Sequence, residues 1–287
     1  MSLPESPRAG ADAAPRISVV VPAFNNARTL AETLRSILEQ DVAGLELIVA
    51  DHSSTDDTAE VMRPFGDDPR VTLLETPAGG GAGRNWNRVT EAARGTYLKL
   101  VCGDDVLRPG VLARQADLLE SSGAVLTACR RDLIDASGEV LFPAWGLRGL
   151  RGRMPGAEAV RRAVRAGSNL FGEPASVMMR RDVLARTGGW FDRFSYLIDQ
   201  ATYTRVLLEG DFVPDDEVGA TFRLSDAQWS VALATRQSAE ARAYHAWLRE
   251  THPETLSAVD QRVGDVRAAL MARARRLSYR VLKRRMR

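Results

Sequence analysis

The sequence predicts an α/β protein with a doubly wound, mostly parallel sheet, and two observations carry that prediction. Apolar, β-branched runs alternate with segments of helical spacing four times before residue 135. These runs are continuously apolar, which is typical of strands that are covered by helices on both faces of a sheet. The chain has 287 residues and is 45% hydrophobic, so it is long enough to bury a substantial core.

The first half gives the regular pattern. Strands are expected at residues 17–25, 45–51, 71–76, 95–102 and 124–135. Helices are expected at 26–40, after the Ser/Thr/Asp-rich start at 53–57, at 87–94 and at 109–123. The first of these helices has apolar residues at helical spacing, namely Leu30, Leu34, Ile37 and Leu38.

The second half is less regular. We expect a loop at 141–156, a helix at 158–167, a strand and then a helix within 175–190, a helix at 200–210, a short strand at 219–224 and helices over 235–287. We divide the chain into a disordered N-terminus (1–15), a domain (16–230) with halves 16–123 and 124–230, and a helical, basic C-terminal extension (231–287).

Cysteine use and hydropathy favour a cytoplasmic protein. The two cysteines, Cys102 and Cys129, do not form a disulfide framework and suit a reducing compartment. The first residues lack the apolar segment of a secretory signal. No stretch reaches the ~18 apolar residues that a membrane-spanning helix needs.

Positive charge is concentrated at the C-terminus. Residues 266–287 carry nine Arg or Lys and no acid, which leaves a net charge of about seven negative for the rest of the chain. Such a segment can bind the anionic inner face of a membrane peripherally, or can simply be a solvated helix face, which is the commonest outcome. Nucleic acid is the least favoured partner, because nothing else in the sequence supports it.

Ligands of a doubly wound sheet bind beyond the carboxyl ends of its strands. The loops expected at that edge are 22–26, 51–57, 77–86 and 102–105. Asp51 follows a strand directly, so its carboxylate can accept N–H bonds from a planar base or cap the next helix; taken alone, a cap is favoured. The glycine-rich loop brings Arg84 to the same edge, although a flexible surface loop is the alternative. It matches neither the dinucleotide nor the P-loop fingerprint.

Asp104 and Asp105 end the fourth expected strand. Two adjacent carboxylates repel each other unless a positive group lies beside them. One interpretation is a Mg²⁺ site completed by substrate phosphates; the other makes Asp105 the N-cap of the helix after Pro109. The two are evenly balanced on the residues alone.

Two further polar residues stand in the second half. Asp199 can be a helix cap or a general base, and the sequence slightly favours a cap. Arg223 can be a surface arginine or a phosphate contact, and the surface position is favoured. The three histidines lack zinc-ligand spacing, Cys102 has no histidine partner in its motif, and no GxSxG elbow is present.

Four stretches, taken together, resemble glycosyltransferase family 2, the inverting nucleotide-sugar transferases of the GT-A fold. They occur in the family's order over residues 16–224: ISVVVPAFNNARTLAETLRSIL, LELIVADHSSTDDT, GRNWNRVTEAARGTYLKLVCGDDVLRPG and GGWFDRFSYLIDQATYTRVLLEG. The resemblance implies a Rossmann-like GT-A sheet whose first half (16–123) binds the nucleotide sugar. The second half (124–230) would then bind the acceptor.

The resemblance also implies site residues. The first loop would pack on the nucleotide through Pro22, Ala23, Phe24 and Asn25. Asp51 would hold the uracil, and Arg84 would lie near the base and the phosphates. Gly103, Asp104 and Asp105 match the DxD region, which binds the ribose and a divalent metal (Mn²⁺ or Mg²⁺), and Asp199 matches the general base. His52 replaces a common acid or Asn, and Cys102 stands where the first Asp of DxD often lies.

The function implied is transfer of one sugar from a UDP-sugar, or another nucleotide sugar, to a hydroxyl acceptor in bacterial cell-wall, polysaccharide or natural-product biosynthesis. Processive members carry a QxxRW motif, which is absent here. The acceptor stays open among a glycan, a lipid-linked glycan, a peptide and a small molecule. Residues 141–175 are expected to shape that choice through Trp145, Asn169, Phe171 and Glu173.

Two other functions are kept as alternatives. The replacements at Cys102 and His52 also suit a catalytically degenerate nucleotide-sugar-binding protein. A sugar nucleotidyltransferase would share the metal chemistry, but it usually opens with a Gly-rich, Lys-bearing loop that VPAFNNARTL lacks. No sequence feature specifies an oligomeric state.

Overall fold

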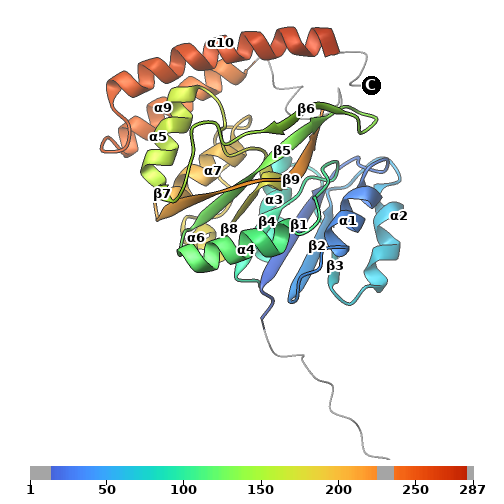
Figure 1. Cartoon of the computed structure of the whole chain (residues 1–287). Helices are drawn as coiled ribbons and strands as arrows, with labels where there is room; N and C mark the ends of the chain where they lie inside the picture. Colours follow the sequence, from blue (N-terminus) through green and yellow to red (C-terminus); the bar gives the residue numbers. More distant parts are fainter. Residues whose placement is uncertain (1–13, 225–235, 283–287) are drawn as a thin grey trace, which may run out of the picture.

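A computed structural model describes residues 14–224 and 236–282 of the chain, and they fold around one mixed sheet (Figure 1). The strands are β1 (Ile17–Ala23), β2 (Leu45–Asp51), β3 (Val71–Glu75), β4 (Tyr97–Leu100), β5 (Leu126–Ile134), β6 (Val140–Trp145), β7 (Met154–Pro155), β8 (Val177–Arg180) and β9 (Asp211–Arg223). Their order across the sheet is β3-β2-β1-β4-β8-β5-β9-β7, and β6 pairs with β5 outside this path.

Helices connect and cover these strands. They are α1 (Leu30–Leu38), α2 (Thr58–Met62), α3 (Gly81–Glu91), α4 (Val111–Ser122), α5 (Gly156–Ala166), α6 (Arg181–Arg186), α7 (Ile198–Leu207), α9 (Gln237–Thr251) and α10 (Ala258–Leu282), with 3₁₀ turns at η1 (Arg63–Asp67) and η2 (Pro174–Ser176). Among the described residues, no helix combines the length and hydropathy needed to cross a bilayer.

The strand directions confirm the predicted, mostly parallel sheet. β1 pairs in parallel with both β2 and β4, β2 pairs in parallel with β3, and β5 pairs in parallel with β9. β8 is antiparallel to both β4 and β5, so β4 and β5 share one direction. The carboxyl ends of β1, β2, β4 and β5 therefore lie along one edge of the sheet.

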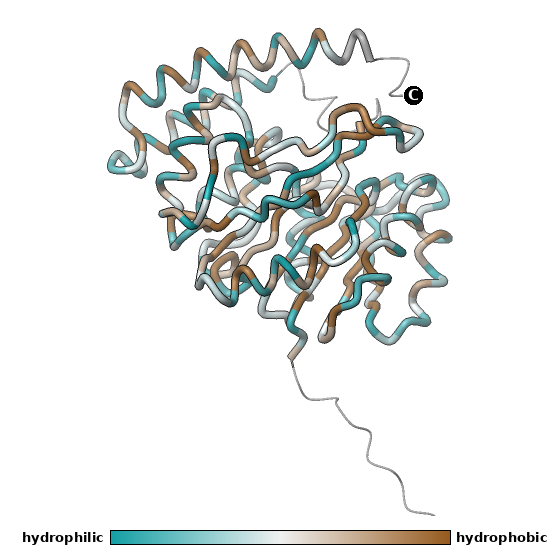
Figure 2. The backbone as a smooth tube through the Cα atoms, in the orientation of Figure 1, coloured by the Kyte–Doolittle hydropathy of each residue, from teal (hydrophilic) through white to brown (hydrophobic). Residues whose placement is uncertain are grey.

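Strand β1 shows why the sheet is doubly wound. Every residue of β1 is buried. Val19 and Val21 pack with Leu34 of α1 on one face, whereas Val20 packs with Val89 of α3 on the other. Burial of such a side chain contributes about 1.5–3 kcal/mol, so a continuously apolar strand gains from helices on both faces. Figure 2 shows the apolar residues concentrated along the strands of the sheet.

Three expected elements differ from the structure. Helix α3 begins at Gly81 rather than at residue 87, directly after Gly79 and Gly80, whose φ values are 90° and 77°. The expected loop at 141–156 contains β6 and β7. The expected short strand at 219–224 is the end of β9, which begins at Asp211 and pairs with β5 through register shifts.

The C-terminal helices share the core of the preceding domain. Tyr244, Leu248 and Ala268 belong to the same buried cluster as Val20 and Phe212 of the sheet. The Tyr244 hydroxyl lies 2.5 Å from Oγ1 of Thr204. The expected boundary at residues 230 and 231 falls outside the described residues, and so does almost all of the expected disordered segment 1–15.

Candidate functional site

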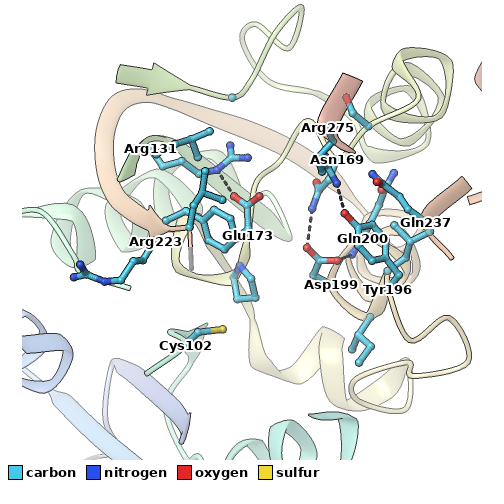
Figure 3. A pocket seen from close by; sticks show the side chains of 18 of the residues that line it. Cys102, Arg131, Asn169, Glu173, Tyr196, Asp199, Gln200, Arg223, Gln237 and Arg275 are labelled. Carbon is cyan, nitrogen blue, oxygen red and sulfur yellow. Dashed lines mark hydrogen bonds and ion pairs between the residues drawn. The ribbon is translucent and has the colours of Figure 1, made fainter. Parts of the chain in front are cut away.

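A cavity of 2520 Å³ opens at the carboxyl edge of the sheet and extends beneath α10. Its walls come from the loops after β1, β2 and β4, from the start of α3, and from β5, α5, α7 and α10. A pocket for one small ligand typically measures about 300–1,000 Å³, so this cavity has room for two substrates. Figure 3 shows side chains of its walls.

The first loop reaches the cavity through Pro22, Phe24 and Asn25, whereas Ala23 is buried behind it. Asn25 has a left-handed φ of 52°, and its Oδ1 accepts a 2.9 Å hydrogen bond from the Thr55 N–H. Phe24 is 55% exposed and its ring centroid lies 5.9 Å from that of His52. The loop therefore offers an exposed aromatic surface on which a planar ring can stack.

Asp51 is buried and is not among the residues that line the cavity. Its Oδ1 accepts a 2.5 Å hydrogen bond from the Ser54 hydroxyl. The N-cap of α2 is Asp57, so the expected cap at Asp51 is wrong. His52 lines the cavity instead, and its Nε2 lies 2.9 Å from the carbonyl oxygen of Gly79.

The glycine-rich loop reaches the cavity, but Arg84 does not. Gly79 and Gly81 line the wall. Arg84 is exposed, and its guanidinium donates a 3.2 Å hydrogen bond to the carbonyl oxygen of Ala78. The arginine that lines the cavity beside the first loop is Arg28, which sequence reasoning missed. Its position two residues before the first turn of α1 gave no signal beyond the Asn-rich turn.

Asn85 joins two strand ends beneath the glycine-rich loop. Its side-chain amide donates to the carbonyl oxygens of Ala23 and Ala50, at 3.3 and 3.4 Å. Its Oδ1 accepts a 2.6 Å hydrogen bond from the Thr76 hydroxyl. Asn85 therefore fixes the ends of β1, β2 and β3 relative to one another at the edge where the cavity opens.

The side chains of the two adjacent acids lie in different environments. Asp104 lines the cavity, whereas the Asp105 side chain is fully buried and accepts a 3.2 Å hydrogen bond from the Arg223 N–H. Burial raises the pKa of Asp105 well above its usual range, and the Asp104 charge adds to this shift. The N-cap of α4 is Gly110, so the expected cap at Asp105 is wrong.

Gly103, which precedes the acid pair, lies against the first loop. A Cβ atom at Gly103 would lie 2.6 Å from Oδ1 of Asn26, so any side chain there would require Asn26 to move. The Gly103 carbonyl oxygen accepts a 2.8 Å hydrogen bond from the Thr29 hydroxyl. The loops after β1 and β4 therefore form one continuous wall of the cavity.

Arg223 is 4% exposed, so the expected surface position is wrong. Its Nε donates a 3.0 Å hydrogen bond to the carbonyl oxygen of Asp104, and its guanidinium pairs with Glu32 at 2.8 Å. Arg223 thus holds the backbone of Asp104 and the side chain of Asp105 from the end of β9.

The acid pair fits one type of metal site. The described residues contain no cluster of three or more His, Cys, Asp or Glu that could hold a metal ion by itself. Mg²⁺ typically uses one or two protein carboxylates together with substrate phosphates and water. Asp104 on the cavity wall can supply such a carboxylate, and the buried Oδ2 of the adjacent Asp105 has no hydrogen-bond partner among the described residues.

Asp199 lies on the cavity wall in the first turn of α7. The N-cap of α7 is Leu197, so the expected cap at Asp199 is wrong. Its Oδ2 accepts a 2.9 Å hydrogen bond from Nδ2 of Asn169, and its Oδ1 accepts a 2.7 Å hydrogen bond from the Gln200 N–H. The carboxylate is therefore oriented by two donors.

Burial raises the pKa of Asp199 to about 7, and the negative charge of Glu173 adds to the shift. The hydrogen bonds from the Gln200 N–H and from Asn169 oppose it, because they stabilise the carboxylate. A carboxylate with a pKa near neutrality is suited to take a proton from a substrate hydroxyl.

Glu173 forms an ion pair with the buried Arg131 of β5, and Figure 3 shows their side chains pointing toward each other. Arg131 also donates a 3.3 Å hydrogen bond to the carbonyl oxygen of Trp145. Sequence reasoning placed Glu173, Trp145 and Asn169 in the acceptor region but missed Arg131, because an arginine inside a strand gives no sign of its partner. Asn169, Glu173 and Arg131 form a polar wall next to Asp199.

Comparisons with known proteins find similar chains by sequence and by structure. The chain matches the family described as Glycosyl transferase family 2 over residues 18–188. It is 33% identical over 238 residues to the uncharacterized protein MT1568 of Mycobacterium tuberculosis, covering 79% of this chain and 73% of that protein. It is 31% identical over 130 residues to the succinoglycan biosynthesis protein ExoO of Rhizobium meliloti, covering 45% of this chain and only 37% of that protein.

Solved structures show the same fold. S. aureus TarS 1-349 in complex with UDP-GlcNAc superposes with a TM-score of 0.67 at 16% identity, covering 82% of this chain and 66% of that chain. The mannosyltransferase PcManGT from Pyrobaculum calidifontis, in complex with GDP-Man and Mn²⁺, gives a TM-score of 0.66 at 19% identity, covering 94% of this chain and 76% of that chain.

Proposed function

Because the chain belongs to glycosyltransferase family 2, we propose that this transferase moves one sugar from a UDP-sugar, or another nucleotide sugar, to a hydroxyl group of a glycan or glycan-like acceptor. The observation that carries the proposal is one shared cavity. It is lined by Asp104, by the first loop and by Asp199. The UDP-GlcNAc and GDP-Man complexes of the two structural neighbours support a nucleotide-sugar donor.

The donor end consists of the loops after β1, β2 and β4. Phe24 and His52 would stack on or border the nucleobase, and Asn25 would contact the nucleoside. Asp51 would reach the base only if its hydrogen bond to Ser54 gave way. Arg28 is the cation on this part of the wall, so we assign to it the diphosphate contact that the sequence suggested for Arg84.

Asp104 would hold a Mn²⁺ or Mg²⁺ ion together with the diphosphate, and Asp105 would support it from beneath. The ion would supply positive charge that stabilises the leaving diphosphate. Arg223 keeps the Asp104 carbonyl and the Asp105 carboxylate in place. The Mn²⁺ in the mannosyltransferase complex supports a metal of this kind.

Asp199 would act as the general base. It takes the proton of the acceptor hydroxyl while the acceptor oxygen forms a bond to the anomeric carbon and the bond to the diphosphate oxygen breaks. A single displacement inverts that carbon and needs no enzyme nucleophile. General-base assistance typically accelerates a reaction about 100- to 10,000-fold.

The acceptor would enter at the end of the cavity formed by α5, α7 and α10. The same proposal includes the expected contact of residues 266–287 with the inner face of a membrane, because α10 forms part of this entrance. A catalytically degenerate nucleotide-sugar-binding protein remains the second candidate, since Cys102 lines the cavity where a DxD acid often lies.

A binding screen followed by a turnover assay tests the proposal. Thermal shift with UDP-GlcNAc, UDP-glucose and GDP-mannose, each with Mn²⁺ or EDTA, should identify one donor that stabilises the protein only with metal. Slow release of UDP or GDP from that donor, with water as the acceptor, should then be lost in Asp199→Asn. Donor binding without any release would support the degenerate protein, and tighter binding of an NTP with a sugar phosphate would support a nucleotidyltransferase.

A further inference from the structure

Helix α10 exposes a row of apolar side chains. Val259, Val266, Leu270 and Leu277 are 63%, 62%, 55% and 63% exposed. Their spacings of seven, four and seven residues place them on one face of a helix with 3.6 residues per turn. The opposite face carries Ala268 and Ala272, which are buried. We call these four exposed residues the α10 stripe, and Figure 2 shows apolar and polar segments alternating along this helix.

Arginines lie on both sides of the α10 stripe. Arg262, Arg267, Arg273 and Arg276 are exposed. Within the described part of the chain, no acidic side chain forms an ion pair with any of these four arginines. Arg267 and Arg276 donate only to the backbone carbonyl oxygens of Arg165 and Ala272. The exposed face of α10 therefore combines apolar side chains with positive charges that are not paired with nearby acidic side chains of the described residues.

We propose that the α10 stripe docks on an anionic lipid surface, with its apolar side chains in the interface and its arginines at the lipid headgroups. A helix with an apolar face bordered by basic residues is the pattern of an interfacial helix. A lipid surface with negative headgroups satisfies both parts of this pattern at once.

A second copy of the chain fits this face less well. Two stripes packed together would bring the arginines of both helices next to one another, and residues 266–287 contain no acid that could pair with them. Like charges that flank an apolar seam oppose helix pairing. The charge on the face thus favours an anionic surface over self-association.

The docking face lies beside the entrance of the cavity. Leu270 belongs both to the α10 stripe and to the cavity wall, and Met271, Ala274 and Arg275 continue that wall. A helix seated on the membrane would hold the entrance at the lipid surface. If the proposed function is correct, the acceptor is therefore a glycan carried by a membrane lipid. The contact also begins earlier than expected from the basic segment 266–287, because it includes Val259.

Vesicle flotation with the full chain tests the docking. Vesicles of phosphatidylcholine alone are compared with vesicles that also contain phosphatidylglycerol. The wild type should float only with the anionic vesicles. Val266→Glu/Leu277→Glu and Arg273→Glu/Arg276→Glu should each reduce the floating fraction about tenfold or more. None of these four residues lines the cavity.

Control variants come from elements other than α10. Val140→Glu on β6 and Arg63→Glu on η1 change exposed residues outside α10 and should float like the wild type. Thermal melting and metal-dependent donor binding, measured without vesicles, show whether each variant is folded and whether the donor site works. If the wild type floats with anionic vesicles but shows no metal-dependent donor binding, the result would count against the proposed function and not against the docking.

Two results would overturn the docking. The first is a wild type that stays at the bottom of the gradient with anionic vesicles. The second is a stripe variant, Val266→Glu/Leu277→Glu, that floats like the wild type, because attraction through the arginines alone would not need the apolar face. A dimer that the stripe variant converts to a monomer, without flotation of the wild type, would assign the face to a second copy instead.

Discussion

Nδ2 of Asn169 donates a 2.9 Å hydrogen bond to Oδ2 of Asp199, and the same amide group also donates to the carbonyl oxygen of Gly172. Its Oδ1 accepts hydrogen bonds from the N–H groups of Phe171 and Gly172. The amide is thus held from both ends and cannot rotate without losing several hydrogen bonds. Asn169 therefore fixes the direction of the Asp199 carboxylate.

Asp199→Asn should reduce turnover about 100- to 10,000-fold, because the amide cannot accept the acceptor's proton. Donor binding should persist, since the proposed donor contacts come from the loops after β1, β2 and β4, whereas Asp199 comes from α7. Turnover of the chosen donor and equilibrium binding of the same donor check the two halves of this prediction. Near-normal turnover would show that Asp199 is not the base.

The same variant should be more stable than the wild type at pH 8. The folded-state pKa of Asp199, about 7, lies above the ordinary aspartate value of 3.8, so between these values the folded protein binds more protons than the unfolded chain. The free energy of unfolding then falls as the pH rises through that window. Above pH 7 the full destabilisation from the buried, ionised Asp199 is present. Asparagine does not ionise and so avoids this destabilisation. The Tm difference between variant and wild type should therefore widen from pH 4 to pH 8.

The acidic limb of the kcat/KM profile should report the pKa of Asp199 and should move in opposite directions in two variants. Asn169→Ala removes a donor to the carboxylate, so the limb should move to higher pH. Glu173→Gln removes a neighbouring negative charge, so the limb should move to lower pH. Glu158→Gln on the exposed side of α5 is the control and should leave the limb in place. Shifts in the same direction would contradict these assignments.

EDTA should abolish transfer, and the two adjacent acids should differ in how strongly they affect metal activation. Asp104→Asn should raise the Mn²⁺ concentration needed for half-maximal activity about tenfold or more, because Asp104 faces the cavity. Asp105→Asn should raise it less, since Asp105 is buried and asparagine can still accept the Arg223 N–H bond. Mn²⁺ activation curves give both values, and activity that survives chelation would exclude the metal role.

Arg28→Ala should weaken donor binding about tenfold, whereas Arg84→Ala should leave it almost unchanged. A hydrogen bond to a charged phosphate is typically worth about 1.5–3 kcal/mol, and only Arg28 lines the cavity. Donor KM and dissociation constants compare the two variants directly. A larger loss for Arg84→Ala would mean that the glycine-rich loop rearranges on binding.

Arg223→Met should lower the free energy of unfolding by about 2–4 kcal/mol, because it leaves Glu32 and the carbonyl oxygen of Asp104 without their buried partner. It should also weaken Mn²⁺ activation, since the acid pair loses its support. Denaturant unfolding and the activation curve measure the two effects. Arg223→Lys should recover part of the unfolding free energy and part of the Mn²⁺ activation. An unchanged activation curve in Arg223→Met would mean that Arg223 only stabilises the fold.

The central strands could be predicted from the sequence because their environment is uniform. β2 was predicted at 45–51 and lies there, since each of its residues is buried and so apolar character alone marks it. β6 was missed because it is an edge strand whose side chains are mostly exposed, so only backbone pairing with β5 defines it. The true start of α3 was hidden by three glycines, which have no helical preference of their own.

The candidate site divides in the same way. The family resemblance implied one site for Asp104 and Asp199, and both line the cavity, although strand order alone favoured a helix cap for Asp199. The position of Arg223 could not be inferred, because its partners Glu32 and Asp104 are 191 and 119 residues away in sequence. Local patterns likewise favoured Arg84 over Arg28, since they do not show which side of a loop faces inward.

Arg223 is the last residue of β9, and this has a consequence for how the protein is made. β1 to β4 leave the ribosome first, and Asp104 and Asp105 follow them directly. The groups that hold these two acids arrive 118 and 119 residues later. A nascent chain that stops before Arg223 therefore has its donor-side loops but lacks the two hydrogen bonds that Arg223 makes to Asp104 and Asp105. The two acids therefore reach their final hydrogen-bonded arrangement only after the acceptor half has been synthesised.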